Sequence, residues 1–85
     1  MLKMTIAFVL VNVQPGSEEE IFDKLKSFEN VKEIYGIYGV YDFLVKVEAD
    51  SLEKIKETVD LKLRKLDKVR SSITMVVIEK YTSTT

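Results

Sequence analysis

The chain has 85 residues, contains neither cysteine nor histidine, and carries a formal net charge of −1 from 14 acidic and 13 basic side chains. This length suits one domain. The composition excludes disulfides, thiolate metal sites and the commonest general base. The charge balance disfavours direct nucleic-acid contact, and no apolar run is long enough to span a bilayer. A cytoplasmic location is therefore expected, and the 32% charged residues suit a thermophile protein.

The first half of the chain predicts a strand, a helix and a second strand. Residues 4–13 are apolar on both alternations, which predicts a strand buried on both faces. Ser17 and Glu20 have capping-box spacing. A helix over about residues 18–27 should therefore begin with this hydroxyl and this carboxylate each accepting a backbone N–H. Residues 31–38 then alternate as a strand.

The second half predicts a strand, a helix and a long final strand. Gly39 supplies the permissive backbone of a tight connection into a strand over residues 41–49. Ser51 caps a second helix. An apolar stripe at helical spacing should face the core: Leu52, Ile55, Val59, Leu63 and Leu66. A strand over residues 69–81 and a frayed tail complete the chain.

The element order β-α-β-β-α-β predicts an α+β fold over residues 1–85, as a single domain without a helix-turn-helix. We expect the ferredoxin-like sandwich of the dimeric α/β-barrel type, a four-stranded antiparallel sheet with two helices on one face. The other face would expose either Ile6, Phe8 and Leu10 or their neighbours on the opposite alternation. Such an apolar face predicts a homodimer, unless the helices are long enough to hide most of it.

No residue pattern predicts catalysis, a cofactor or a metal site, because the acidic residues fall at helix starts and on outward helix faces. Asp42 is the exception, an acid directly after the tight connection. Arg70, Ser71, Ser72 and Thr74 form a second polar cluster. A carboxylate with a set of hydroxyls matches the two ends of an amino acid. An equally good explanation is that Asp42 accepts hydrogen bonds from turn amides, and that the hydroxyl residues are there because they favour strands.

Residues 37–47 contain Gly39-Val40-Tyr41-Asp42, which resembles the Gly-x-Tyr-Asp signature in the effector domain of the Lrp/AsnC (leucine-responsive, "feast/famine") regulators. Residues 66–76 resemble the start of the last strand in that family, and the likeness covers essentially the whole chain. It implies a RAM domain that dimerises through its sheet and assembles into rings, commonly octamers. The implied ligand-binding residues are Gly39, Val40, Tyr41, Asp42, Ser71, Ser72 and Thr74.

The resemblance also implies an amino-acid effector, held where dimers meet. Full-length relatives carry a DNA-binding helix-turn-helix, so this chain resembles stand-alone members that act on transcription by co-assembly with full-length regulators. Two alternatives stay open. A small enzyme of the dimeric α+β barrel kind shares the topology, but the chain has no histidine. An ACT-like regulatory domain shares the element order, but its glycine-rich first loop is not evident here. The residues do not identify the effector, the ring size or the partner regulator.

Overall fold

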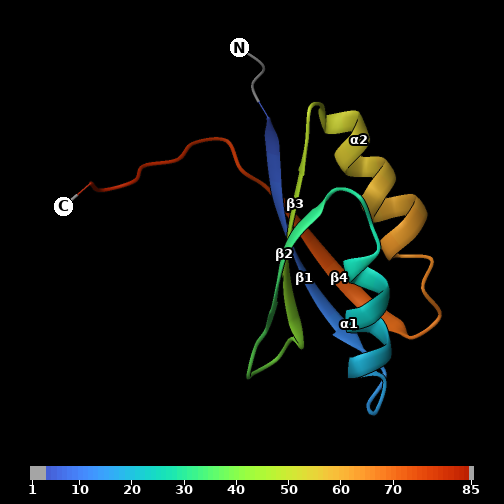
Figure 1. Ribbon diagram of the computed structural model, residues 1–85. Helices are drawn as coiled ribbons and strands as arrows, with labels where there is room; N and C mark the ends of the chain where they lie inside the picture. The colour runs from blue at the N-terminus through green and yellow to red at the C-terminus, as the bar shows by residue number, and fades with distance from the viewer. Residues whose placement is uncertain (1–3, 85) are drawn as a thin grey trace.

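A computed structural model describes residues 4–84, and shows one four-stranded antiparallel sheet with helices on one face (Figure 1). In chain order the elements are β1 (Thr5–Val13), α1 (Glu18–Lys26), β2 (Val31–Gly36), β3 (Phe43–Ala49), α2 (Leu52–Lys56), η1 (Glu57–Leu63) and β4 (Val69–Val76). The strand order is β2-β3-β1-β4, so the first and third strands are central. The predicted ferredoxin-like sandwich is confirmed.

The core lies between the helices and one face of the sheet. Because strand side chains alternate between faces, Ala7, Val9 and Val11 of β1 are fully buried against the helices. The intervening residues Ile6, Phe8 and Leu10 lie on the uncovered face and are only partly buried. Across the β1–β4 ladder, Phe8 lies opposite Met75 and Leu10 lies opposite Ile73. We call this uncovered side the open face.

The two helix starts differ from one another. Ser51 caps α2 as predicted, since its hydroxyl accepts the Lys54 N–H at 3.2 Å. The capping box predicted for α1 is wrong. Ser17 has φ −104° and ψ 9°, away from the extended conformation typical of an N-cap, and its side chain caps no N–H. Glu20 instead forms an ion pair with Lys24, at 3.4 Å.

The second helical segment changes type along its length. It is α-helical in α2 and π-helical in η1, where the Arg64 N–H donates to the Val59 carbonyl, five residues back, at 2.8 Å. Most of the predicted apolar stripe is confirmed, with Ile55, Val59 and Leu63 buried and Leu66 partly buried against the core. Leu52 departs from the prediction, since it stays 43% exposed.

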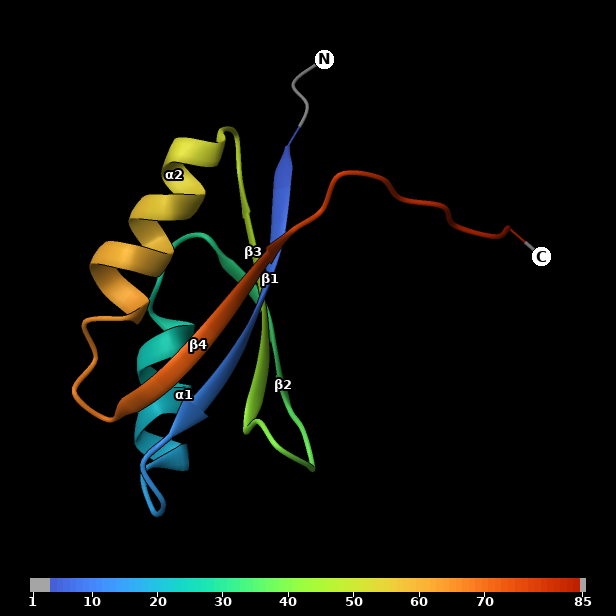
Figure 2. The ribbon, with the colours of Figure 1, turned by 180° about the vertical axis from the view of Figure 1, so that it is seen from behind.

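The predicted last strand is too long, because β4 ends at Val76. The Val77 N–H still donates to the Ile6 carbonyl at 2.8 Å, one residue from the start of β1 at Thr5. Residues 77–84, the C-terminal arm, extend away on the side opposite the helices (Figures 1 and 2). Ile78 and Tyr81 of the arm are almost fully exposed. Within residues 4–84, every helix is too short or too polar to cross a membrane.

Candidate functional site

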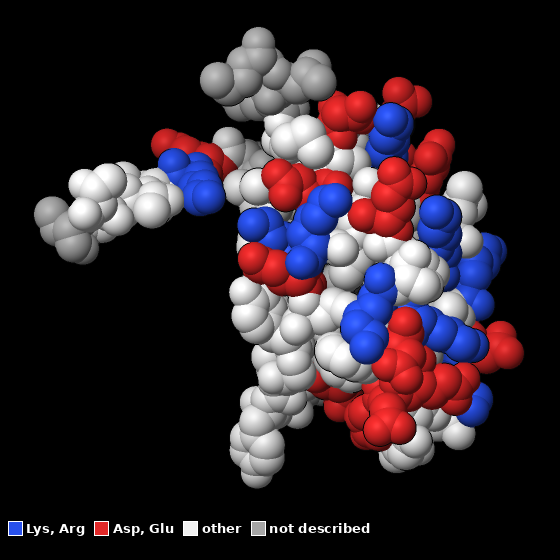
Figure 3. All heavy atoms as spheres, in the orientation of Figure 1, with Lys and Arg blue, Asp and Glu red and all other residues white. Residues whose placement is uncertain are grey.

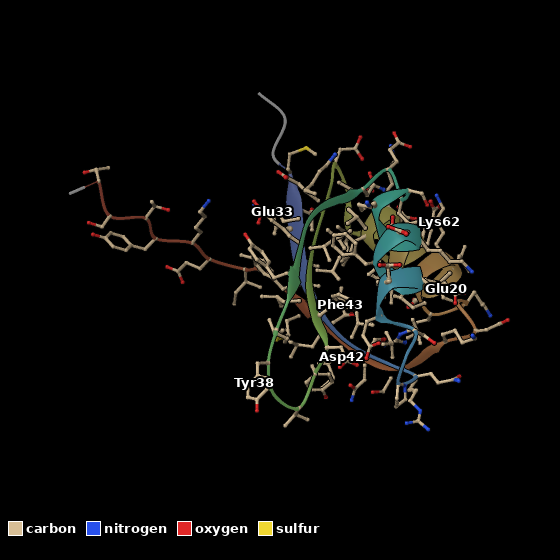
Figure 4. The ribbon with its side chains drawn as sticks, turned by 60° about the horizontal axis from the view of Figure 1, so that its bottom comes forward. Glu20, Glu33, Tyr38, Asp42, Phe43 and Lys62 are labelled. Carbon is tan, nitrogen blue, oxygen red and sulfur yellow. The ribbon has the colours of Figure 1, made fainter. Side chains whose placement is uncertain are left out.

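The predicted tight connection between the middle strands is a six-residue loop over residues 37–42. Its two ends are joined by the Ile37 N–H, which donates to the Asp42 carbonyl at 3.0 Å. Gly39 has φ +144°, a backbone conformation that favours glycine. Figure 4 shows Tyr38 near the protruding tip and Asp42 at the root, beside the start of β3. Asp42 therefore precedes the strand instead of lying within it.

The loop and the end of β2 form an uncharged protrusion. Residues 34–41 include three tyrosines and no charged side chain. Tyr38 and Val40 are highly exposed, and Ile37 is 38% exposed. Figure 3 shows this protrusion in white at the lower left, whereas acidic and basic side chains alternate over the helical side. An exposed apolar loop of this kind is typical of a contact surface.

Asp42 is held by the neighbouring strand. Its Oδ2 accepts the Val13 N–H at 2.8 Å, and its own N–H donates to the Val11 carbonyl at 2.9 Å. The half-buried carboxylate thereby extends the β1–β3 ladder by one rung. The sequence left two interpretations of Asp42 open, a hydrogen bond to backbone amides of the turn or a contact with a ligand. The structure shows a hydrogen bond to a backbone amide, but this amide belongs to β1 and not to the turn. No further hydrogen bond to this carboxylate occurs within residues 4–84, so Oδ1 can accept one from a ligand.

The second polar cluster is divided between the two faces of β4. Ser71 is exposed and lies on the open face. Ser72 and Thr74 pair in register with Val11 and Val9, and so lie on the helix face. The prediction that Ser72 and Thr74 bind a ligand stays a prediction. Such a ligand would have to lie on the helix side of β4.

The loop and the start of β4 lie at the same end of the sheet but do not touch. β1 runs between β3 and β4 in the strand order. Two strand spacings separate the backbones on either side of it by about 10 Å. Within one chain, β1 therefore lies between Asp42 and Ser71.

Tyr35 and Glu33 form a polar contact on the open face that sequence reasoning missed. The Tyr35 hydroxyl donates to Glu33 Oε1 at 2.7 Å. This hydrogen bond, and then the negative charge of Glu33, raise the pKa of Tyr35 above its ordinary value of about 10. Glu33 and Tyr35 are two residues apart on one strand, and this spacing alone predicts that their side chains lie on the same face. No three His, Cys, Asp or Glu residues among those the structure describes lie close enough together to hold a metal ion.

These features define a class of domain, an α+β sandwich with an exposed sheet face and a polar sheet end. The sequence profile of the Lrp/AsnC ligand binding domain matches residues 6–85. The chain therefore belongs to the Lrp/AsnC ligand binding domain family, as the resemblance of residues 37–47 predicted.

Individual relatives agree with this assignment. The HTH-type transcriptional regulator FL11 of Pyrococcus furiosus is 29% identical over 94% of this chain and 52% of its own length. The chain thus spans about half the length of the curated relatives it matches. The crystal structure of FFRP-DM1 superposes with a TM-score of 0.84 at 38% identity, covering 87% of this chain and 99% of that one.

A more distant structure shows the fold alone. The transcriptional regulator NMB0573 of Neisseria meningitidis, solved as a complex with L-Met, has a TM-score of 0.82 at 19% identity. The match covers 99% of this chain and 55% of that one.

Proposed function

We propose that this chain is an amino-acid-sensing, self-assembling effector module that acts on transcription indirectly, by co-assembly with full-length DNA-binding relatives. The observation that carries the proposal is the Asp42 carboxylate, with Oδ2 anchored on the Val13 N–H and Oδ1 available at the root of an exposed loop. An anchored carboxylate is a pre-oriented acceptor for an ammonium group. Family membership supports a ligand site in this domain.

The effector binds at a seam between dimers, where two copies of the chain each supply part of the site. One copy supplies the loop residues Gly39, Val40, Tyr41 and Asp42, and another supplies Ser71 at the start of β4. The separation of these groups by β1 within one chain supports a shared site. The uncharged protrusion supports it too, since contact with another copy would bury its apolar side chains. Ligand binding and assembly are coupled because the effector binds the assembled state better.

The dimer itself forms through the open face. Phe8 and Leu10 lie there opposite Met75 and Ile73, which are 43% and 45% exposed. A contiguous apolar face of this kind marks an interaction surface, and a second copy related by a two-fold axis would cover it with the same residues. The C-terminal arm leaves on this side, with Tyr81 available to the same partner. Such dimers then build the octamer or larger ring.

Two comparisons support the regulatory part of the proposal. The curated relatives are named HTH-type transcriptional regulators, and the part of them that this chain matches is about half of their length. Under this proposal, a chain that shares this half joins full-length regulators through it. The L-Met in the NMB0573 complex supports an amino acid as the class of effector.

The ligand proposal is tested by calorimetry and light scattering with each of the twenty amino acids. At least one should bind and change the particle mass. Asp42→Asn should abolish both effects, because its amide oxygen still accepts the Val13 N–H while the charge that attracts the ammonium is gone. Asp23→Asn, an exposed acid on α1, is the matched control. Binding that survives unchanged in Asp42→Asn would contradict the proposal.

The dimer is tested separately by mass in dilute solution. Phe8→Glu places a charge in the centre of the open face and should give a monomer. Leu61→Glu makes the same kind of change at a residue that is 64% exposed on the helical side, and should keep the dimer mass. A Phe8→Glu protein with the mass of the unsubstituted chain would show that the open face is not the interface.

A further inference from the structure

A groove of about 380 Å³ lies between α1 and β2, at the β2 edge of the sheet. We call it the α1–β2 groove, and its lining side chains are Phe22, Lys26, Val31, Lys32, Glu33 and Ile34. Half of these are partly buried apolar side chains that pack against the core. The groove therefore offers an apolar surface between charged side chains, and it lies apart from the loop over residues 37–42.

The strand beside the groove has an unpaired edge. In the order β2-β3-β1-β4, β2 pairs with β3 on one side, and no strand within residues 4–84 covers its other side. The outward N–H and C=O groups of an edge strand can pair with an extended segment of another chain. The α1–β2 groove is therefore suited to an extended segment that carries an apolar side chain.

The C-terminal arm is a segment of this kind. It follows β4, the opposite edge strand, and adopts neither helix nor strand. Ile78 and Tyr81 of the arm are 95% and 88% exposed. Large aromatic side chains dominate the energetics of protein contacts, so the exposed ring of Tyr81 favours burial against another chain.

The arm is long enough to reach the α1–β2 groove of a second copy that covers the open face. It extends away from the sheet on the side opposite the helices (Figures 1 and 2). Sheets packed face to face lie about 10 Å apart. Extended residues advance roughly 3.3 Å each, so about three residues of the arm cross this gap. Lys80 and Tyr81 then arrive level with the second sheet.

The strand register places this arrival point beside β2 of the second copy. One row of paired residues joins the end of β4 to the start of β2 across the sheet, through Val76, Ala7, Val47 and Val31. The end of β4 and the start of β2 are therefore at the same level along the strands. A two-fold axis parallel to the strands, between two open faces, brings the end of β4 in one copy over the start of β2 in the other.

We propose that the C-terminal arm of one copy docks in the α1–β2 groove of a second copy, so that the two chains exchange arms. The inference rests on the open-face dimer of the proposed function and adds a separate contact to it. Tyr81 packs on Phe22 and Ile34 of the second copy, which buries its ring. Lys80 pairs with Glu33 of the second copy, the acid on the open-face side of β2.

Charge reversal tests this pair, with the dissociation constant of the dimer measured by analytical ultracentrifugation. Lys80→Glu and Glu33→Lys should each weaken the dimer roughly tenfold, because each brings like charges together. The double variant restores opposite charges in exchanged positions and should regain most of the affinity. Leu61→Glu, on the helical side, is the control and should leave the dissociation constant unchanged. Losses that simply add in the double variant would overturn the pairing.

Cysteine cross-linking tests the groove, since the chain has no cysteine of its own. A protein that carries both Tyr81→Cys and Lys32→Cys should form a disulfide-linked dimer under mild oxidation, seen on a non-reducing gel. Tyr81→Cys with Leu61→Cys is the control, because Leu61 lies outside the groove. A linked dimer that is missing, or that forms equally in the control, would overturn the arm contact.

The dimer variant Phe8→Glu separates this inference from the proposed function. A dimer that is lost in Phe8→Glu but has an unchanged dissociation constant in Lys80→Glu and Glu33→Lys would overturn the arm exchange and leave the open-face dimer intact. A dimer weakened by all three substitutions, with the affinity regained in the double variant, supports both.

Discussion

The hydrogen bond between Asp42 and β1 predicts a measurable loss of stability when Asp42 is replaced by alanine. The substitution leaves the Val13 N–H, in a residue that is 4% exposed, without its carboxylate acceptor at 2.8 Å. Hydrogen bonds to charged groups contribute about 1.5–3 kcal/mol. Because Asp42 is half-buried, we expect the free energy of unfolding to fall by about 2 kcal/mol. For a domain of this size that corresponds to a melting temperature lower by roughly 10 °C.

Asp42→Asn is the control, because it keeps an oxygen acceptor of the same shape and should lose less than about 1 kcal/mol. Urea unfolding followed by circular dichroism measures both variants, at one fixed protein concentration because assembly itself stabilises the chain. The reasoning is refuted if alanine is as stable as aspartate, or if asparagine is as destabilising as alanine.

Three further predictions concern the core, the open face and the loop. Leu63→Ala removes a fully buried side chain and should lower the free energy of unfolding by about 3 kcal/mol; a loss below about 1 kcal/mol would contradict this packing. Glu33→Gln should lower the pKa of Tyr35 towards about 10, measured by tyrosinate absorbance, because the carboxylate that favours the neutral phenol is gone. An unchanged titration would exclude the contact. Gly39→Ala should lower the free energy of unfolding by on the order of 1–3 kcal/mol, because alanine is strained at φ +144°. A steric clash does not contribute, since the added Cβ would meet no atom within 4 Å. Gly36→Ala, with equal space and no positive φ, should cost less.

Most of the fold could be predicted because it depends on local patterns. The alternation in residues 4–13 and the helical spacing of Ile55, Val59 and Leu63 follow from backbone geometry, and short connections leave few ways to join the elements. The family signature in residues 37–47 was equally local. The Ser17 capping box failed because spacing does not determine the backbone angles at a helix start.

The candidate site was predicted less completely. Sequence spacing identified Asp42, but left open whether its carboxylate bound backbone or ligand. The structure shows the backbone bond to Val13, 29 residues away in the chain. Ser71 and Thr74 are close in sequence, but they are three residues apart on one strand, so their side chains lie on opposite faces. Their assignment to the open face and the helix face required the register of β4 against β1.

The sequence by itself determined the element order, the helix and strand periodicities, the family and the uncharged loop, because each depends on residues that are near neighbours in the chain. The tertiary structure alone decided four features. These are the alternation of β1 that faces the helices, the end of β4 at Val76, the anchoring of Asp42, and the division of Ser71 and Thr74 between the two faces of β4. Each of them depends on the register and packing of segments distant in sequence, which no local pattern specifies.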